Sequence, residues 1–82
     1  MAIGGLMHDI KHRDRPFHIE TEYYAGTAER RIVTVIYERG TVRKKISSAA
    51  ESGDEETCRA QMTRQHKEAL QAIVRGEFDA TA

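Results

Sequence analysis

Residues 31–42 read RIVTVIYERGTV and decide the fold. The first part is dense in β-branched residues, which pack well on a pleated sheet, so we expect a strand over residues 31–38. Gly40 then supplies the positive φ that a tight hairpin turn requires, and a second strand is expected from Thr41 to about Ser47. The stretch therefore predicts an antiparallel hairpin.

An alternating pattern precedes this hairpin. Residues 17–24 read FHIETEYY, in which every second side chain belongs to one face: Phe17, Ile19, Thr21 and Tyr23. Small and polar residues around Gly26 interrupt the pattern before the next strand begins. We therefore expect a meander of three antiparallel strands, with residues 31–38 in the centre.

A long helix is predicted after the strands. Residues 52–55 read SGDE, the form of a capping box, and Gly76 is a typical stop, which together indicate a helix of about 22 residues. Its apolar stripe consists of Cys58, Met62, His66, Ala69, Leu70 and Ile73, while Gln61 and Gln65 are expected off the stripe. The expected fold class is α+β, a three-stranded antiparallel β-meander followed by one long C-terminal helix packed on one face.

Pro16 marks the expected start of the folded domain, because a proline disfavours helix at the preceding residue. We predict a single domain over residues 17–79 and a short tail over residues 80–82. Residues 1–16 are expected to form a flexible or weakly helical head. Four apolar residues in this head have helical spacing: Ile3, Leu6, Met7 and Ile10.

The central strand is apolar on both faces, although the sequence offers one convincing helix to cover them. Its side chains divide into two sets, Val33, Val35 and Tyr37 on one face and Ile32, Thr34 and Ile36 on the other. We expect the second set to be a candidate interaction face, covered by the head or by a second copy of the chain. A homodimer or another protein partner is therefore predicted. Exposure of these β-branched residues without any partner is the alternative.

The composition balances thirteen basic against thirteen acidic residues, for a formal net charge of zero. This balance argues against a surface dedicated to nucleic acid. The charge is uneven along the chain, with a net +1 over residues 1–16, +2 over residues 17–50 and −3 over residues 51–82. The lone Cys58 indicates a reducing compartment, and no apolar run approaches the roughly 20 residues that span a bilayer. We therefore expect a cytoplasmic protein with no membrane contact.

Four basic residues gather around the second strand of the hairpin: Arg39, Arg43, Lys44 and Lys45. With Tyr37 as a stacking ring, this candidate basic patch is one way in which a sheet binds single-stranded nucleic acid, which is the alternative function. Arg43 and Lys45 also alternate with Val42 and Ile46, a pattern that protects an exposed edge strand from unwanted pairing. Both explanations of the patch stay open.

The sequence contains no evident set of acid, base and nucleophile, so we expect no enzymatic activity and no cofactor. His66 is a candidate boundary histidine, with one ring nitrogen bonded to a carboxylate or tyrosine of the first strand; a catalytic or pH-sensing role is the alternative. Cys58 and His66 cannot form a dyad within one helix, because eight residues separate them by about 12 Å. His8 and His12 have the spacing of a metal-binding pair on a helix, but they lack a second pair, so we expect no metal site.

The body of the chain resembles a small bacterial domain of unknown function, of deltaproteobacterial type, over about residues 17–79. The matching residues are Thr21-Glu22, Ile32-Val33-Thr34, Gly40, Lys45, Ser47, Met62, Gln65-His66-Lys67, Gly76 and Phe78. The resemblance implies the same order of three strands and one helix, and it implies no particular activity. From the sequence we expect a non-catalytic protein-interaction module that associates with itself.

Overall fold

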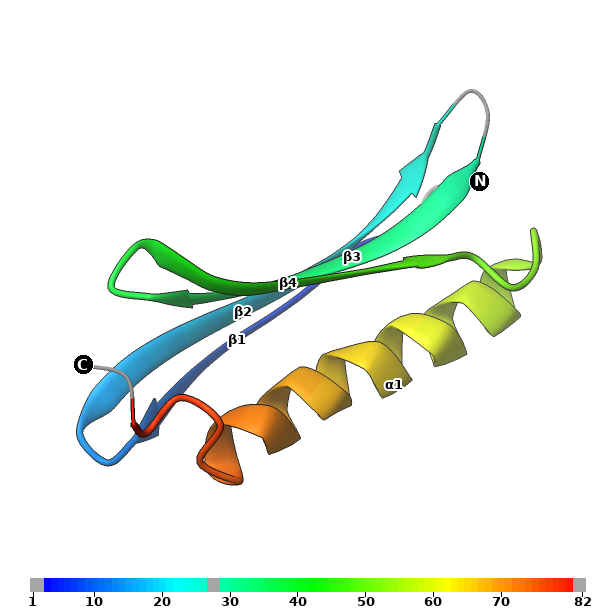
Figure 1. The fold of residues 1–82 in the computed structure, drawn as a ribbon. Coiled ribbons are helices and arrows are strands. Elements are labelled where there is room, and N and C mark those ends of the chain that lie inside the picture. Colours follow the sequence, from blue (N-terminus) through cyan, green and yellow to red (C-terminus); the bar gives the residue numbers. More distant parts are fainter. Residues whose placement is uncertain (1–2, 27–28, 81–82) are drawn as a thin grey trace.

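The computed structural model describes residues 3–26 and 29–80. It contains one antiparallel sheet of four strands in the order β1-β2-β3-β4, followed by a single helix (Figure 1). The elements are β1 (Leu6–His12), β2 (Arg15–Ala25), β3 (Arg30–Glu38), β4 (Thr41–Ala49) and α1 (Glu55–Val74). The predicted α+β class, the antiparallel meander and the C-terminal helix are confirmed. The predicted count of three strands is wrong, because there is a fourth strand at the N-terminal edge.

The extra strand is β1, in the segment that was expected to be a flexible or weakly helical head. A two-residue turn at Arg13 and Asp14, with φ of 53° and 62°, folds β1 back onto β2. Pro16 lies inside β2 and is tolerated there because β3 ends opposite Phe17, so Pro16 has a paired neighbour on the β1 side alone. The expected domain boundary after residue 16 therefore falls within a strand. The expected tail over residues 80–82 lies mostly outside the described residues.

The predicted hairpin between β3 and β4 is confirmed, since Arg39 and Gly40 form its turn with φ of 51° and 79°. A β-bulge interrupts the pairing just after the turn: Tyr37 pairs with Val42, while Ile36 pairs with Lys44. Arg43 is thus an extra residue on β4, and the bulge reverses the alternation that the sequence predicts. Val42 and Ile46 consequently lie on opposite faces, and Val42 is 55% exposed.

The helix begins and ends close to the predicted positions. The Asp54 carboxylate accepts from the backbone N–H of Thr57 at 3.0 Å, and Gly76 ends the helix with a φ of 95°. The buried side of α1 consists of Cys58, Gln61, Met62, Gln65, His66, Ala69, Ala72 and Ile73. Burial of Gln61 and Gln65 differs from the prediction that they lie off the stripe.

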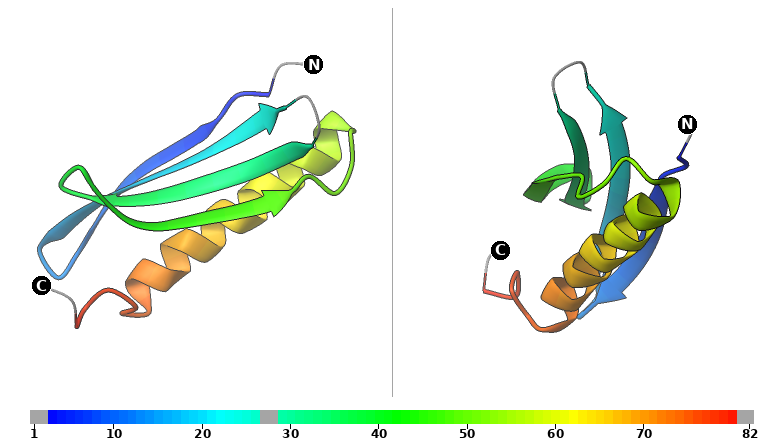
Figure 2. Two further views of the ribbon diagram at one scale, coloured as in Figure 1. Left: turned by 45° about the horizontal axis from the view of Figure 1, so that its top comes forward. Right: turned by 90° about the vertical axis from the view of Figure 1, so that its right-hand side faces the viewer.

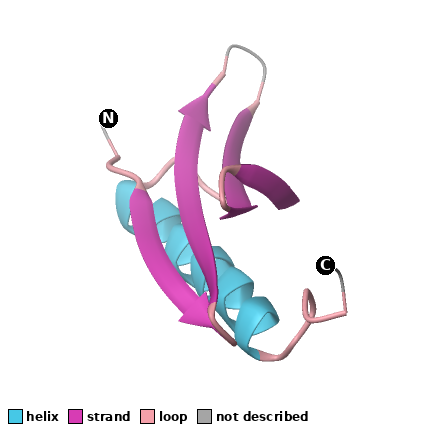
Figure 3. Cartoon of the chain, turned by 90° about the vertical axis from the view of Figure 1, so that its left-hand side faces the viewer, coloured by secondary structure: helices cyan, strands magenta, loops and turns pink. Residues whose placement is uncertain are grey.

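Figures 2 and 3 show α1 along one face of the sheet, with no described element on the other face. The covered face carries Ile32, Thr34 and Ile36, which are all 0% exposed. The expectation that these three residues form an interaction face is therefore wrong. The register explains the choice of face: Ile19 pairs with Ile36 and Thr21 with Thr34, so the buried sides of β2 and β3 coincide beneath the helix.

Residues after the helix fold back over the turn end of the sheet. The Phe78 ring lies 5.9 Å from the Phe17 ring, and its backbone carbonyl accepts from Arg15 Nη1 at 2.7 Å. Arg15 also donates twice to the Glu38 carboxylate, at 2.7 Å each, and Arg43 lies over the Phe78 ring. These contacts close the core at that end of the sheet. No helix in residues 3–26 or 29–80 is long and apolar enough to cross a membrane.

Candidate functional site

His66 lies at the centre of the interface between helix and sheet. The residue is 3% exposed; its Nδ1 lies 2.8 Å from Thr21 Oγ1 and its Nε2 lies 2.7 Å from His8 Nδ1. The prediction of a packed histidine with a bonded ring nitrogen is confirmed, although its β2 partner is a threonine rather than a carboxylate or tyrosine. His8 is exposed at the edge of the sheet, so the contact links a buried ring to the surface.

The hydrogen bonds continue from Thr21 into the interior. Thr21 Oγ1 lies 2.7 Å from Thr34 Oγ1, which accepts from Gln65 Nε2 at 3.1 Å. Gln65 Nε2 also lies 3.2 Å from the backbone carbonyl of Ile32, and Ser48 donates to Gln65 Oε1 at 2.5 Å. A buried polar chain therefore connects Gln65, Thr34, Thr21, His66 and His8 in this order.

The orientation of the Gln65 amide follows from its backbone partners. A backbone carbonyl can only accept, so the atom facing the carbonyls of Ile32 and Ile46, each 3.2 Å away, is the amide nitrogen. The hydroxyls of Thr34 and Thr21 can each donate one proton and also accept, so either of them can be the donor in their bond, and the contact of Thr21 with His66 Nδ1 fits either tautomer of the imidazole. At the other side of the ring, one of the facing nitrogens of His66 and His8 carries the proton and the other accepts it.

The environment of His66 favours its neutral form. Burial, and secondarily the neighbouring His8, hold the pKa of His66 below its ordinary value of 6.5. The ring centroids of His8 and His66 are 4.8 Å apart. This is close to the distance expected for two imidazole rings whose hydrogen-bonded nitrogens point directly at each other. A proton fits between nitrogens aimed at each other in this way, whereas a tetrahedral zinc ion needs its ligands at an angle.

The other residues considered for chemistry are dispersed. His12 does not meet His8, because its Nε2 lies 3.1 Å from an Asp79 carboxylate oxygen. Cys58 is 0% exposed and its thiol donates to the backbone carbonyl of Ser52 at 3.1 Å. In the described part of the chain, no three His, Cys, Asp or Glu side chains gather as metal ligands would.

The uncovered side of the sheet is termed the open face. Its centre is formed by Val33, Val35 and Tyr37 of β3, which are half-buried. Larger exposure is found at three apolar or aromatic residues around them: Met7 at 63%, Tyr24 at 55% and Val42 at 55%. An exposed surface with this many apolar side chains is typical of a site of protein contact.

Charges on the open face are sorted by strand. Asp9, Glu20 and Glu22 lie on β1 and β2, which form the acidic half, with Lys11 at the turn end as an exception. Arg31 and Lys45 lie on β3 and β4, which form the basic half. The open face thus carries both signs of charge on opposite sides of its apolar centre.

His18 lies within the acidic half and holds two of its carboxylates. Its Nδ1 lies 2.7 Å from Asp9 Oδ1, and its Nε2 lies 2.8 Å from Glu20 Oε2. The hydrogen bonds to Asp9 and then Glu20 raise the pKa of His18 above its ordinary value of 6.5. The sequence signal for this cluster is the placement of His18 and Glu20 on the same strand face, but their partner Asp9 belongs to the unpredicted strand.

The predicted basic patch does not form one free surface. Arg43 forms an ion pair with Glu38, and Lys44 Nζ lies 2.5 Å from Glu77 Oε1. Arg39 and Lys45 are exposed, the former in the hairpin turn and the latter on the open face. The four residues therefore point to different surroundings, which weakens their joint attraction for a phosphate backbone.

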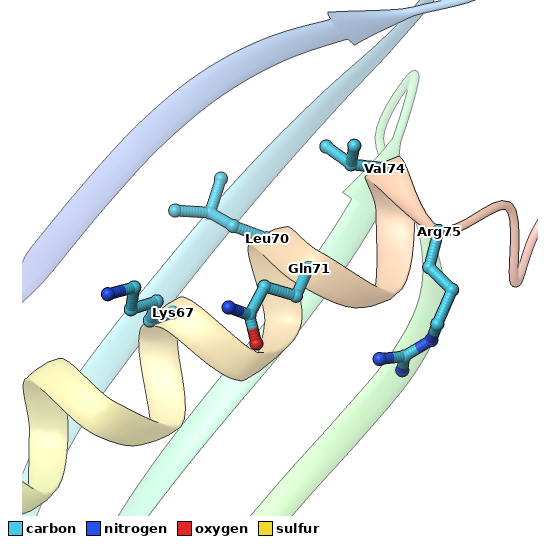
Figure 4. A pocket seen from close by; sticks show the side chains of 5 residues that line it. All are labelled: Lys67, Leu70, Gln71, Val74 and Arg75. Carbon is cyan, nitrogen blue, oxygen red and sulfur yellow. The ribbon is translucent and has the colours of Figure 1, made fainter.

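A hollow of about 450 Å³ lies along the last turns of α1, and Figure 4 shows the five side chains that line it. Leu70 and Val74 supply its apolar floor, and Lys67, Gln71 and Arg75 complete the lining. Because all five side chains come from one helix, the hollow has no facing wall within the described residues. It lacks the enclosure that a small-molecule site usually has.

No protein-family model, curated protein or solved structure matches this chain. The resemblance to a deltaproteobacterial-type domain therefore stays a prediction.

Proposed function

We propose that this protein is a non-catalytic interaction module that forms a homodimer through the open face of its sheet. The single observation that carries the proposal is the uncovered surface around Val33, Val35 and Tyr37, opposite the helix. The proposed interface is therefore not the predicted face of Ile32, Thr34 and Ile36, because α1 covers that face. One face of an antiparallel sheet can remain solvated, but Met7, Tyr24 and Val42 enlarge the apolar surface here.

The size of the open face suits a sheet-on-sheet contact. The four strands lie about 4.8 Å apart, and each presents about eight residues with a rise of about 3.3 Å per residue. The open face therefore covers roughly 500 Å² per copy. Two copies would together bury about 1,000 Å², which is the lower range of a specific interface. The presence of both charge signs on one face also favours a second copy, because each half has its complement on an identical surface.

Sedimentation equilibrium at high micromolar concentration tests the proposal. We expect a dimer of the wild-type chain and a monomer of Val35→Glu, because the substitution places a charge at the centre of the contact. The matched control is Val74→Glu on α1, where the side chain is 59% exposed and far from the open face; it should leave the dimer intact. A wild-type chain that stays monomeric, or equal behaviour of both variants, contradicts the proposal.

Single-stranded nucleic-acid binding is the less supported function, because Arg43 and Lys44 are engaged in ion pairs with Glu38 and Glu77. Salt-sensitive binding of an oligonucleotide that is lost in the double variant Arg39→Glu/Lys45→Glu would favour it instead. A cytoplasmic location remains a proposal based on the lone Cys58.

A further inference from the structure

We propose that the two copies are related by a twofold axis parallel to the strands, so that the acidic half of each copy faces the basic half of the other. This inference rests on the proposed homodimer. It concerns the arrangement of the interface, which the presence of a dimer alone leaves open.

Two arrangements stack a pair of identical sheets with their strands aligned. If the axis is parallel to the strands, the order of the strands is reversed across the interface, and β1 and β2 lie over the partner's β4 and β3. If the axis lies in the interface and is perpendicular to the strands, each strand lies over its own copy. The first arrangement exchanges the two halves, whereas the second superposes them.

The charges distinguish these arrangements. Glu20 and Glu22 are neighbours on the outer side of β2, and Arg31 and Lys45 lie on the outer sides of β3 and β4. Superposed halves would bring the carboxylates of one copy over those of the other and cations over cations, which weakens the association. Exchanged halves place each pair of carboxylates next to the cations of the second copy.

The pairing register gives the rows that would meet. Met7, Glu20, Val35 and Lys45 form one row across the sheet, because each pairs with the next. An axis parallel to the strands preserves the height of a row, so Glu20 would lie over the second copy's Val35, between that copy's Lys45 on one side and its Glu20 on the other. In the adjacent row, His18 would lie over the ring of the second copy's Tyr37.

A charge-inversion experiment separates the two arrangements. The double variant Glu20→Lys/Glu22→Lys leaves both halves basic, and we expect its dimer to weaken about tenfold or more. Adding Arg31→Glu and Lys45→Glu inverts the whole pattern, so this fourfold variant should again form a homodimer. Mixed with a mass-tagged wild-type chain, however, it should form no mixed dimer by native mass spectrometry, because like charges would then face each other.

The outcomes are distinct. Mixed dimers of wild type and the fourfold variant that outnumber either homodimer overturn the parallel axis and leave the homodimer standing. A wild-type chain without any dimer overturns the homodimer itself. Circular dichroism establishes that each variant is folded. If the fourfold variant does not fold, the double variant Glu20→Lys/Lys45→Glu inverts the charges within a single row. Its homodimers and its mixed dimers with the wild-type chain are then compared in the same way.

Discussion

His8 Nδ1 lies 2.7 Å from His66 Nε2, and this contact ties the edge strand β1 to the buried side of α1. The two facing nitrogens share one proton, because an N–H can donate only to a ring nitrogen that carries no hydrogen. A second proton on the pair would place N–H against N–H and break the contact. The link between β1 and α1 is therefore sensitive to acid.

Replacing His66 should change stability in a pH-dependent way. Because burial lowers the pKa of His66 below 6.5, the unfolded chain binds more protons as the pH falls below that value, and the wild-type free energy of unfolding decreases. His66→Gln removes this dependence and costs about 1–3 kcal/mol at pH 7.5. We expect the difference in the free energy of unfolding between wild type and variant, measured by urea unfolding, to become smaller towards pH 5.

His66→Ala is the companion variant for this measurement. It should cost more than the glutamine variant at neutral pH, because it leaves a cavity as well as unpaired hydroxyls. Small and equal losses for both variants at every pH would contradict a structural or switching role of His66.

The threonine pair should behave as one unit. Thr21→Val removes the hydroxyl that bonds to both His66 Nδ1 and Thr34, and we expect a loss of about 1–3 kcal/mol. Thr34→Val removes the hydroxyl that bonds to Thr21 and should cost a similar amount. The double variant should lose less than the sum, because both groups are removed together. A double-mutant cycle by chemical denaturation measures this coupling, and strict additivity would contradict the bond between the two hydroxyls.

His18 should show the opposite pH dependence from His66. Its pKa is raised by Asp9 and Glu20, so its contribution to stability is present below pH 6.5 and is lost as the pH rises through the raised pKa. We therefore expect His18→Gln to be destabilised at pH 5.5 and unchanged at pH 9 in thermal melts. Asp9→Asn, which removes the largest cause of the raised pKa, should reproduce part of the effect. A loss of thermal stability of the same size at pH 5.5 and at pH 9 would contradict a stabilising role of protonated His18.

The C-terminal segment should contribute to the core through one ring. Phe78 is 6% exposed and packs on Phe17, so Phe78→Ala should lower the free energy of unfolding by about 3 kcal/mol. Val74→Ala, at a side chain that is 59% exposed, is the control and should change it by less than about 0.5 kcal/mol. Similar effects of the two substitutions would show that the segment does not pack as described.

The turn between β1 and β2 offers a stabilising substitution. Asp14 has a φ of 62°, in a region that costs side chains roughly 1 kcal/mol, so Asp14→Gly should stabilise the protein by up to about that amount. Gly40→Ala should destabilise the protein, because Gly40 has a φ of 79°, which a residue with a side chain rarely adopts; an added Cβ would meet nothing within 4 Å, so no clash contributes. The midpoint of urea unfolding of each variant is compared with that of the wild-type chain. A lower midpoint for Asp14→Gly would contradict the turn geometry.

The sequence predicts most of the architecture because its local signals agree. Alternation over β2 and the Arg39-Gly40 turn match the structure, whereas the predicted capping box at Ser52 and Glu55 is replaced by Asp54, which caps α1 by accepting from the backbone N–H of Thr57. The first strand was missed because Arg13 and Asp14 lack the Asn or Gly that commonly marks a two-residue hairpin turn. Pro16 was interpreted as a boundary, although a proline is compatible with a strand where one neighbour is absent.

The site was harder to predict than the fold, because it depends on contacts across elements. The covered face of β3 is determined by its register with β2, since both its faces are apolar in sequence. Gln65 was assigned to the solvent by its polarity, yet its amide bonds to the carbonyl of Ile32 and to Thr34. The direct link from His66 to His8 does not follow from the sequence when residues 1–16 are expected to form a flexible or weakly helical head.

Cys58 gives this protein a natural reporter of its own opening. It is the sole thiol of the chain, it is 0% exposed, and it is held to the carbonyl of Ser52 at the first turn of α1. A thiol reagent can react with it only in molecules in which the first turn of α1 has opened, by local fraying or by separation from the sheet. The alkylation rate of the unmodified protein thus measures how often this end of the interface between helix and sheet opens, with no label to perturb it.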